Sequence, residues 1–287
     1  MSTSEPVDLS GLPRLKETIG RYGLNADKKL GQHFLLDPMI LSAIAASAGD
    51  IHDARVIEIG PGPGGLTRAL LEAGARLTAI ERDSRCVRAL GELVEAARGR
   101  LELIDADALD IDTDALAGGE PYRIIANLPY NVGNELLVRW LTGAQRLIDM
   151  RLMFQREVVD RICAVPRTSA YGRLSILCQT ICEVRRVMDL PAGAFHPPPK
   201  VRSALVALTP RYPRLDTSFI RSLERVTAAA FQQRRKMLRS SLKPLGLDVE
   251  RLLDGTGVAP TMRAEEVDVA RFGLLADRVL RARQGPS

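Results

Sequence analysis

Short apolar runs alternate with helical patterns of hydrophobic residues between Val56 and Pro210. The runs have the length of strands, and the segments between them repeat their apolar residues at helical spacing. This alternation predicts a mostly parallel sheet with helices on both faces, and such sheets bind ligands beyond the carboxyl ends of their strands. The predicted strands are residues 54–60, 76–81, 101–107, 122–127, 151–155 and 203–210, and the clearest predicted helices are 66–74, 84–97 and 134–144.

After Pro210 the pattern becomes helical only. Residues 217–246 predict one long helix, and shorter helices follow at about 248–254 and 263–283. The residues up to about Leu12 are polar, and we expect them to be frayed. The sequence therefore predicts a flexible N-terminus over 1–12, a catalytic α/β domain over 13–210 and a small helical domain over 211–287.

The composition is that of a globular protein with an ordinary core. Of the 287 residues, 46% are hydrophobic and 26% are charged. Aromatic residues make up only 4%, which predicts few stacked bases if the partner is a nucleic acid. The net charge of +5 permits an anionic partner without requiring one. No secretory signal and no apolar run of membrane-spanning length is visible, so we expect a cytoplasmic protein that does not contact membranes.

The cysteines and histidines do not predict a metal site. The four cysteines lack C-x-x-C spacing, and only three histidines are present. A zinc site would need two such pairs or nearby histidines. We therefore expect no metal and interpret the thiols as small core residues in a reducing compartment. The cysteines are Cys86, Cys163, Cys178 and Cys182.

A glycine-rich turn closes the first predicted strand and opens a helix. Glycines there let the backbone turn tightly and let a ligand approach it closely. Their spacing fits both the G-x-G-x-x-G of dinucleotide-binding enzymes and the G-x-G-x-G of methyltransferases. Glu81 ends the next predicted strand, where a carboxylate accepts hydrogen bonds from ribose hydroxyls in either class. The turn therefore predicts an adenosine-type cofactor, and a plain structural turn is the less favoured alternative. The glycines are Gly60, Gly62, Gly64 and Gly65.

Two acidic residues favour the methyltransferase class. Glu58 lies two positions before the first glycine, a placement that resembles motif I of S-adenosylmethionine-dependent enzymes. Asp107 ends the third predicted strand, where it would accept a hydrogen bond from the cofactor's adenine amino group. Taken alone, Asp107 is equally well interpreted as a helix N-cap or a solvated loop residue.

The motif Asn127-Leu128-Pro129-Tyr130 follows the fourth predicted strand and separates the two cofactor classes. An exocyclic adenine amine is a poor nucleophile, because its lone pair is delocalised into the ring. Two acceptors on its N–H bonds, Asn127 Oδ1 and a backbone carbonyl near Leu128, would draw the nitrogen toward tetrahedral geometry. Pro129 would fix that carbonyl, and Tyr130 would stack on the base once it has left its helix. The motif predicts methyl transfer to an adenine amine, and an ordinary turn before a proline is the alternative.

With these motifs, the chain resembles the ribosomal RNA adenine dimethylases of the bacterial small-subunit type. The similarity runs nearly end to end and includes three further segments, Lys28–Leu35, Phe195–Ser203 and Phe231–Leu238. It implies S-adenosylmethionine as the cofactor. It also implies a Rossmann-like methyltransferase domain with a mostly parallel seven-stranded sheet, followed by a small all-helical C-terminal domain.

The resemblance also implies roles for individual residues. Gln32 to Leu35 would fold over the cofactor, with His33 and Leu35 in contact with it. The family usually has asparagine where this chain has His33, and a neutral imidazole nitrogen can replace the amide hydrogen bond. Phe195 would form a second stacking face opposite Tyr130, or else be a core phenylalanine that anchors its proline-rich loop.

The implied reaction gives N6,N6-dimethyladenosine at two adjacent adenosines near the 3′ end of 16S rRNA. The implied substrate is a pre-30S particle, the implied enzyme is a monomer, and a role in small-subunit biogenesis follows.

Basic residues are concentrated between Arg211 and Lys243, where nine stand against two acidic residues. Several of them fall along one stripe of the predicted long helix. A solvated charged face is one interpretation, but beside an RNA-modifying site phosphate contact is favoured. We expect that neutralising Arg234 and Arg235 weakens rRNA binding and leaves cofactor affinity intact. The predicted RNA-binding residues are Arg221, Arg225, Arg234, Arg235, Lys236 and Arg239.

Three other functions are compatible with parts of the sequence. A 23S rRNA adenine methylase of the macrolide-resistance type would use the same chemistry, but the helical C-terminal segment favours the small-subunit enzyme. A nicotinamide-dependent dehydrogenase fits the glycines and leaves the Asn127 motif without a role. A ribosome-assembly factor whose catalysis is incidental is the third, and that role can coexist with the enzymatic one.

Overall fold

The computed structural model of the chain describes residues 7–24 and 33–284 and divides into two compact units. The first unit comprises the residues up to Trp140 together with Ala144–Arg156 and Arg186–Ala207. The second comprises Leu141–Gly143, Glu157–Arg185 and the residues from Leu208 onward. The predicted domain boundary at residue 210 therefore differs from the structure, because Glu157–Arg185 belongs to the same unit as the C-terminal helices.

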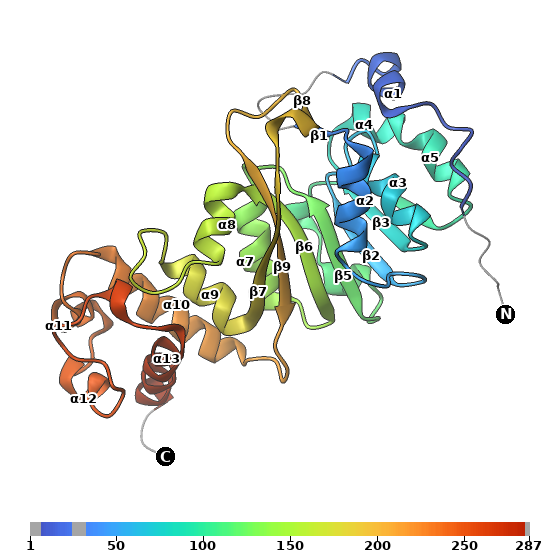
Figure 1. Ribbon diagram of the computed structural model, residues 1–287. Helices are drawn as coiled ribbons and strands as arrows, with labels where there is room; N and C mark the ends of the chain where they lie inside the picture. The colour runs from blue at the N-terminus through green and yellow to red at the C-terminus, as the bar shows by residue number, and fades with distance from the viewer. Residues whose placement is uncertain (1–6, 25–32, 285–287) are drawn as a thin grey trace. The chain divides into compact units, whose positions relative to one another are not determined.

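A seven-stranded sheet forms the framework of the first unit (Figure 1). Its strands are β2 (Arg55–Ile59), β3 (Arg76–Glu81), β4 (Leu101–Asp105), β5 (Tyr122–Asn127), β6 (Leu147–Gln155), β7 (Cys182–Leu190) and β9 (Ser203–Pro210). Their order is β4-β3-β2-β5-β6-β9-β7. The pairs β2–β3, β3–β4, β2–β5 and β5–β6 are parallel, so the predicted mostly parallel seven-stranded sheet is confirmed.

The strand order reverses at β2. The chain runs outward through β3 and β4 and then returns to β5 on the other side of β2. Ligands bind open α/β sheets at such a reversal, beyond the carboxyl ends of the strands. The glycine-rich turn after β2, Glu81 at the end of β3 and Asn127 at the end of β5 all lie at this edge.

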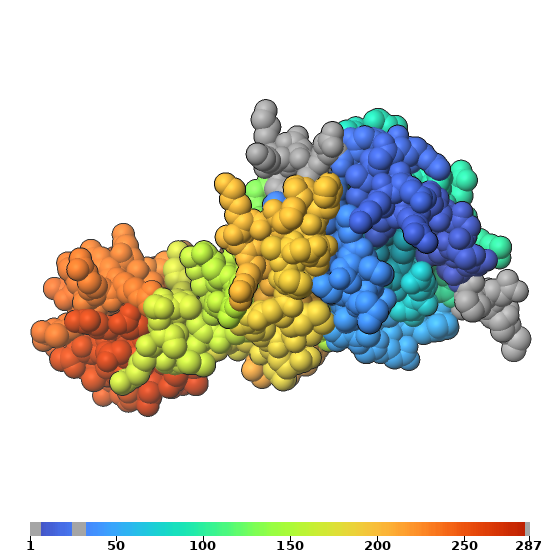
Figure 2. Space-filling view, turned by 45° about the horizontal axis from the view of Figure 1, so that its top comes forward, coloured from blue at the N-terminus to red at the C-terminus, as the bar shows by residue number. Residues whose placement is uncertain are grey.

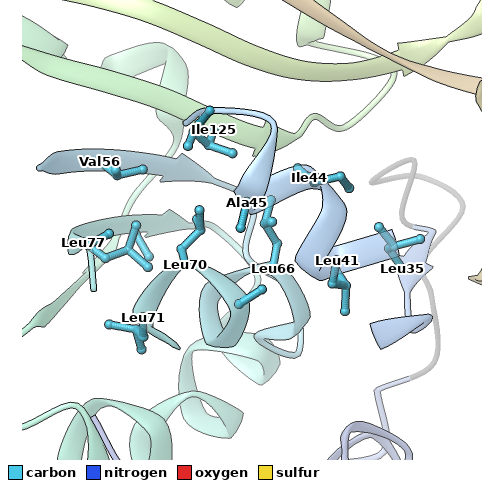
Figure 3. Packing of buried hydrophobic residues seen from close by; sticks show 14 of the residues in the cluster. Leu35, Leu41, Ile44, Ala45, Val56, Leu66, Leu70, Leu71, Leu77 and Ile125 are labelled. Atoms are coloured by element: carbon cyan, nitrogen blue, oxygen red, sulfur yellow. The ribbon is translucent and has the colours of Figure 1, made fainter. Parts of the chain in front are cut away.

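Helices α2 (Pro38–Ala46) and α3 (Gly65–Glu72) pack against the sheet. Figure 3 shows Leu66 and Leu70 of α3 gathered with Ile44 of α2 and with Val56 and Ile125 of the strands. All five side chains are buried. This packing holds both ends of the glycine-rich turn, since the turn runs from β2 directly into α3.

The first described segment is packed, and the expectation of a frayed N-terminus is wrong for residues 7–12. Leu9 is only 8% exposed and belongs to the main hydrophobic cluster, and Val7 and Leu12 pack against that cluster. Beyond it, α1 (Leu15–Arg21) contributes Arg21, which pairs with Glu92 at 2.7 Å. Figure 2 shows this dark blue segment beside teal residues of the same unit.

The remaining elements of the first unit are short. The predicted helix 84–97 is divided at Leu90 into two helices. A separate two-stranded antiparallel sheet joins residues 34–35 to residues 195–196, far apart in sequence. These elements are α4 (Ser84–Ala89), α5 (Gly91–Ala96), α6 (Thr113–Leu116), β1 (Phe34–Leu35) and β8 (Phe195–His196), while α7 (Gly133–Gly143) runs into the second unit.

The second unit is built mainly of helices, which confirms the predicted helical C-terminal region. They are α8 (Arg156–Ile162), α9 (Arg173–Ile181), α10 (Thr217–Gln232), α11 (Leu238–Ser241), α12 (Val249–Leu253) and α13 (Val269–Gln284). Within residues 7–24 and 33–284, no helix has both the length and the apolarity that crossing a membrane requires.

The predicted long helix 217–246 is wrong, because α10 ends at Gln232. The chain then leaves the helix and pairs with another segment. Met237 forms an isolated antiparallel bridge with Arg263, and Leu238 N donates to the Met262 carbonyl at 2.8 Å. These bonds take the place of the helical hydrogen bonds that residues 233–237 would otherwise make. The Leu238 side chain is buried in this arrangement.

Candidate active site

A cavity lies where the strand order reverses, beyond the ends of β2, β3, β4 and β5. It brings together every cofactor-binding residue that the sequence predicted and four of the five predicted catalytic residues. The predicted residues that line it are His33, Leu35, Glu58, Gly60, Gly62, Glu81, Asp107, Asn127, Leu128, Pro129 and Tyr130. Phe195 is not among the lining residues.

The glycine-rich turn brings its backbone to the wall of the cavity. Gly60, Gly62 and Gly64 have φ angles of 65°, 56° and 88°, the left-handed region that favours glycine. A Cβ atom on Gly62 would also lie 3.1 Å from the Phe34 ring. The conformation therefore favours glycine at position 62, and a side chain there would also press against the Phe34 ring.

Glu81 is the buried carboxylate that ends β3. Its Oε2 accepts a hydrogen bond from Gly62 N at 3.0 Å, and its Oε1 accepts from Asp83 N at 2.8 Å. Burial raises the pKa of Glu81, and these backbone hydrogen bonds act in the opposite direction. Because a carboxylate has about four acceptor positions, Glu81 can still accept a ribose hydroxyl while it holds the turn.

Glu58 lies at the same edge and is only 1% exposed. Burial raises the pKa of its carboxyl to about 8, the neighbouring Thr67 hydroxyl lowers it, and the charge of Glu81 raises it further. Its Oε2 has no hydrogen-bond partner among the described residues. A buried acceptor without a partner is costly, so this oxygen is suited to a ligand that brings a donor or a positive charge.

Asp107 lines the cavity and also caps a helical turn. Its Oδ1 accepts from Leu109 N at 3.0 Å, and its Oδ2 pairs with Arg82 at 2.8 Å. The structure therefore contains the N-cap that we considered as the alternative. The N-cap does not remove Asp107 from the cavity wall, where an adenine amino group could compete with Arg82.

The side chain of Asn127 has a defined orientation. Its Nδ2 donates to the backbone carbonyl of His33 at 3.2 Å. Because a carbonyl can only accept, the amide nitrogen must face His33 and Oδ1 must face the other way. Oδ1 receives no hydrogen bond from the described residues, so it is available as an acceptor.

The backbone after Asn127 supplies a second acceptor. The carbonyl of Pro129 accepts from Gly133 N at 3.0 Å and from Val132 N at 3.3 Å, which closes the turn into α7. The carbonyl of Leu128 receives no hydrogen bond from the described part of the chain. The structure therefore leaves Leu128, rather than Pro129, with a backbone acceptor available beside Asn127.

The ring of Tyr130 is held at its hydroxyl. That hydroxyl forms a hydrogen bond of 2.7 Å with Ser203 Oγ, and burial raises the Tyr130 pKa. Ser203 itself is fully buried at the start of β9. The His33 ring lies 5.6 Å from the Tyr130 ring, centroid to centroid, at a tilt of 35°.

His33 forms hydrogen bonds through both its side chain and its backbone carbonyl. Its Nδ1 lies 2.9 Å from the carbonyl of Pro197, which can only accept, so Nδ1 carries a proton. In the neutral ring, Nε2 is then an acceptor. Gln32, which the resemblance also placed over the cofactor, lies outside the described residues.

Phe195 does not face the cavity, and its prediction as a stacking residue is wrong in this structure. It is 3% exposed and belongs to the main hydrophobic cluster. The antiparallel pairing of Leu35 with Phe195 fixes both backbones at the cavity edge, while the Phe195 side chain points into the core. The alternative interpretation, a core phenylalanine that anchors the proline-rich loop, is the one that the structure contains.

Sequence comparison identifies the family to which this arrangement belongs. The family model described as "Ribosomal RNA adenine dimethylase" matches residues 23–279. The chain belongs to this family. Membership confirms the predicted cofactor, S-adenosylmethionine, for this adenine dimethylase.

Bacterial relatives are similar across almost the whole chain. A protein of Rhodospirillum rubrum named ribosomal RNA small subunit methyltransferase A is 53% identical over 283 residues, covering 96% of this chain and 98% of the relative. A protein of Caulobacter vibrioides with the same name is 56% identical over 255 residues, covering 89% and 98%.

Solved structures show the same fold. A dimethyladenosine transferase from Plasmodium falciparum aligns with a TM-score of 0.72 at 25% identity, covering 85% of this chain and 96% of that one. The 23S rRNA methyltransferase ErmE aligns with a TM-score of 0.67 at 26% identity, covering 86% and 100%. The predicted Rossmann-like methyltransferase fold is thereby confirmed.

The predicted RNA-binding residues of this dimethylase do not lie on one helix. Arg221 and Arg225 are on α10, Arg235 and Lys236 are in the turn after it, and Arg239 is on α11. All five are exposed.

Arg234 is bound within the second unit. Its side chain pairs with Glu265 at 2.8 Å and donates to the carbonyls of Ser169 at 2.9 Å and Thr168 at 3.1 Å. These three bonds engage the guanidinium, so we withdraw Arg234 from the predicted RNA contacts.

Sequence reasoning missed several residues of the cavity. Phe34 lies against Gly62, and Ile80 and Asp83 flank Glu81. The sequence could have indicated these residues only through their closeness to predicted site residues along the chain. Within the described residues, no group of histidine, cysteine and acidic side chains is arranged to hold a metal ion.

Proposed function

We propose that the protein uses S-adenosylmethionine to dimethylate N6 of two adjacent adenosines near the 3′ end of 16S rRNA. Relatives more than half identical over nearly the whole chain carry the small-subunit name, which supports this substrate. The observation that carries the proposed chemistry is the Asn127 amide. Its nitrogen donates to the His33 carbonyl, which leaves its oxygen available to accept from an incoming amine.

The cavity fits the proposed cofactor. Glu58 Oε2 is a buried acceptor without a partner, which suits the positively charged methionine portion. Glu81 can accept a ribose hydroxyl, and Asp107 can accept from the adenine amino group. His33 and Leu35 would contact the bound molecule from the segment above it, with His33 Nε2 in place of the family's asparagine amide. The cofactor supplies an activated methyl group on a sulfonium.

Asn127 Oδ1 and the Leu128 carbonyl each accept one N–H of the target amine. Held in this way, the nitrogen moves toward tetrahedral geometry and its lone pair leaves the ring. Pro129 fixes the backbone that aims the Leu128 carbonyl, and Tyr130 stacks on the flipped base. Neither acceptor is basic enough to keep the released proton, which passes to water. Positioning of the amine supplies most of the acceleration.

The second methylation requires a different use of the same acceptors. A monomethylated amine has only one N–H, so one acceptor must become dispensable. Asn127 can rotate if it gives up its bond to His33, whereas the Leu128 carbonyl is fixed by the turn. We expect Leu128 to hold the remaining N–H in the second round.

The proposed partner is 16S rRNA in a pre-30S particle, bound by a monomeric enzyme in the cytoplasm during small-subunit biogenesis. The exposed basic residues of the second unit would contact its phosphates. These residues are Arg221, Arg225, Arg235, Lys236 and Arg239.

The 23S rRNA alternative is less well supported. ErmE, a 23S rRNA methyltransferase, is only 26% identical to this chain, whereas the relatives with the small-subunit name are 53% and 56% identical. The shared fold explains the structural likeness to ErmE and does not choose the substrate.

The test is mass spectrometry of both rRNAs from cells that lack their own 16S dimethylation and express this chain or its Asn127→Ala variant. We expect dimethyladenosine in 16S rRNA from the wild type and a loss of about a hundredfold in rate for the variant with purified protein. Calorimetry should show that the cofactor affinity of the variant lies within about tenfold of the wild-type affinity, a difference that corresponds to one hydrogen bond. Modification of 23S rRNA alone would favour the alternative, and no modification of either rRNA would overturn the proposal.

A further inference from the structure

A groove in the second unit is lined by three arginines from three different helices. Arg173 begins α9, Arg225 lies in the middle of α10 and Arg283 lies near the end of α13. The groove also contains Phe231 and Leu245, and none of the described residues that line it is acidic. The sequence gives no sign of this convergence, because the three arginines are far apart along the chain.

The three arginines have no partner among the described residues, although they come from three different helices. All three are exposed, and no hydrogen bond or ion pair to any of them is found there. Two arginines of the same unit that lie outside the groove are paired. Arg281 binds Asp277 at 2.9 Å, and Arg271 binds Asp268 at 3.0 Å. The groove therefore concentrates positive charge that the protein does not neutralise.

The shape and chemistry of the groove suit a phosphodiester chain. Each guanidinium offers several N–H donors in a planar fork that matches phosphate oxygens. Phe231 of the lining packs against the Tyr171 ring at 6.3 Å and the Phe272 ring at 5.8 Å, centroid to centroid. Small residues of α10 leave the space open between the arginines.

We propose that this groove binds a phosphodiester segment of the rRNA substrate. This contact is separate from the binding of the target adenines in the active-site cavity. The inference rests on the proposed function, since it takes rRNA as the partner. It adds Arg173 and Arg283 to the RNA-binding residues and gives Arg225 a defined setting. The contact is to the backbone, so it contributes affinity and salt dependence without selecting a sequence.

The test uses the full chain with Arg173→Gln, Arg225→Gln and Arg283→Gln combined, and measures its binding to 16S rRNA transcribed in vitro across a salt series. Each phosphate contact contributes about 0.7–0.9 to the slope of log affinity against log salt. We expect the triple variant to reduce that slope by about 2 and to weaken binding at least about tenfold at low salt. Calorimetry should give unchanged affinity for S-adenosylmethionine.

The matched control is Arg281→Gln, which removes a charge from α13 outside the groove. We expect it to change the slope little. A triple variant that behaves like this control would overturn the groove proposal. So would loss of binding to poly-L-glutamate with an unchanged rRNA slope, which would indicate an acidic protein partner. Failure of the wild type to methylate 16S rRNA would instead count against the proposed function. The salt dependence of rRNA binding could still be compared between the wild type and the triple variant, because it does not depend on methylation.

Discussion

Glu58 couples the stability of the cofactor-free protein to pH. The pKa of its buried carboxyl is raised from 4.5 to about 8, so the folded chain binds this proton more tightly than the unfolded chain. The resulting stabilisation is complete below about pH 4.5 and is lost as the pH rises through 8.

We therefore expect Glu58→Gln, which stays uncharged, to gain stability over the wild type as the pH rises. The difference should grow by at most about 1.4 kcal/mol per pH unit, or about 2–4 °C per kcal/mol in Tm, and should level off above pH 8. Thermal melts from pH 5 to 9 measure it. Glu102→Gln, at an exposed glutamate, is the control, and a Glu58→Gln difference that is constant over this range contradicts the expectation.

Ser203 is a positioning residue for the Tyr130 ring. The two hydroxyls form a hydrogen bond of 2.7 Å, and Ser203 is fully buried. Removing either hydroxyl therefore leaves the other one without this hydrogen bond. We expect Ser203→Ala and Tyr130→Phe each to reduce kcat/KM for rRNA about fivefold, the value of roughly 1 kcal/mol. The double variant should be no worse than either single one. Steady-state methylation tests this, and additive losses would show that the two residues act separately.

At this scale the sequence predicted which residues meet but not always which way they face. The acceptor Asn127 and the carboxylate Glu81 were identifiable, because strand ends of a parallel sheet converge. Phe195 was misassigned because a two-residue strand gives no alternation from which to infer its face. The bond from Asn127 to the His33 carbonyl joins segments far apart in sequence, and no local pattern encodes it.

Among the elements, the turn after α10 depends on Arg234. Its guanidinium joins that turn to Glu265 and to the carbonyls of Ser169 and Thr168. We expect Arg234→Gln to destabilise the protein by about 1–2 kcal/mol, since several hydrogen bonds are lost at a partly exposed site. Arg235→Gln should leave the thermal melt unchanged and reduce the salt slope of rRNA binding. Equal melts for the two variants would contradict the assignment of Arg234 to the fold.

Two elements differed from their predicted form for tertiary reasons. Strand β7 was missed because it lies last in the sheet order and only its two end residues are buried. Its charged residues are exposed or half-buried, which weakens the hydrophobic signal of the strand. The helix α10 was predicted too long because the residues after Gln232 keep helical spacing. Pairing of Met237 with Arg263 outweighs that local preference.

On the scale of the whole molecule, the boundary between the units decides where the chain can be divided. The Tyr171 hydroxyl donates to the Val267 carbonyl at 2.9 Å, and the Tyr171 ring contacts Phe231. A fragment that ends at residue 210 would keep Tyr171 and the buried face of α9 without the helices that cover them. We expect this fragment to aggregate and to be found mostly in the insoluble fraction.

Truncation after Gln284 is the control, because it keeps every described element. Expression trials followed by circular dichroism compare the two. A soluble 1–210 fragment with a cooperative melt would show that Glu157–Arg185 does not depend on the C-terminal helices.

The hold on Asn127 has an evolutionary consequence. Its partner is the peptide carbonyl of residue 33, which every amino acid possesses, rather than an imidazole or carboxamide group. A change of side chain at position 33 therefore does not remove the hydrogen bond that orients the Asn127 amide. Under the proposed function, an exchange of asparagine for histidine at position 33 would change the contact with the methyl donor and leave the bond that orients Asn127 in place.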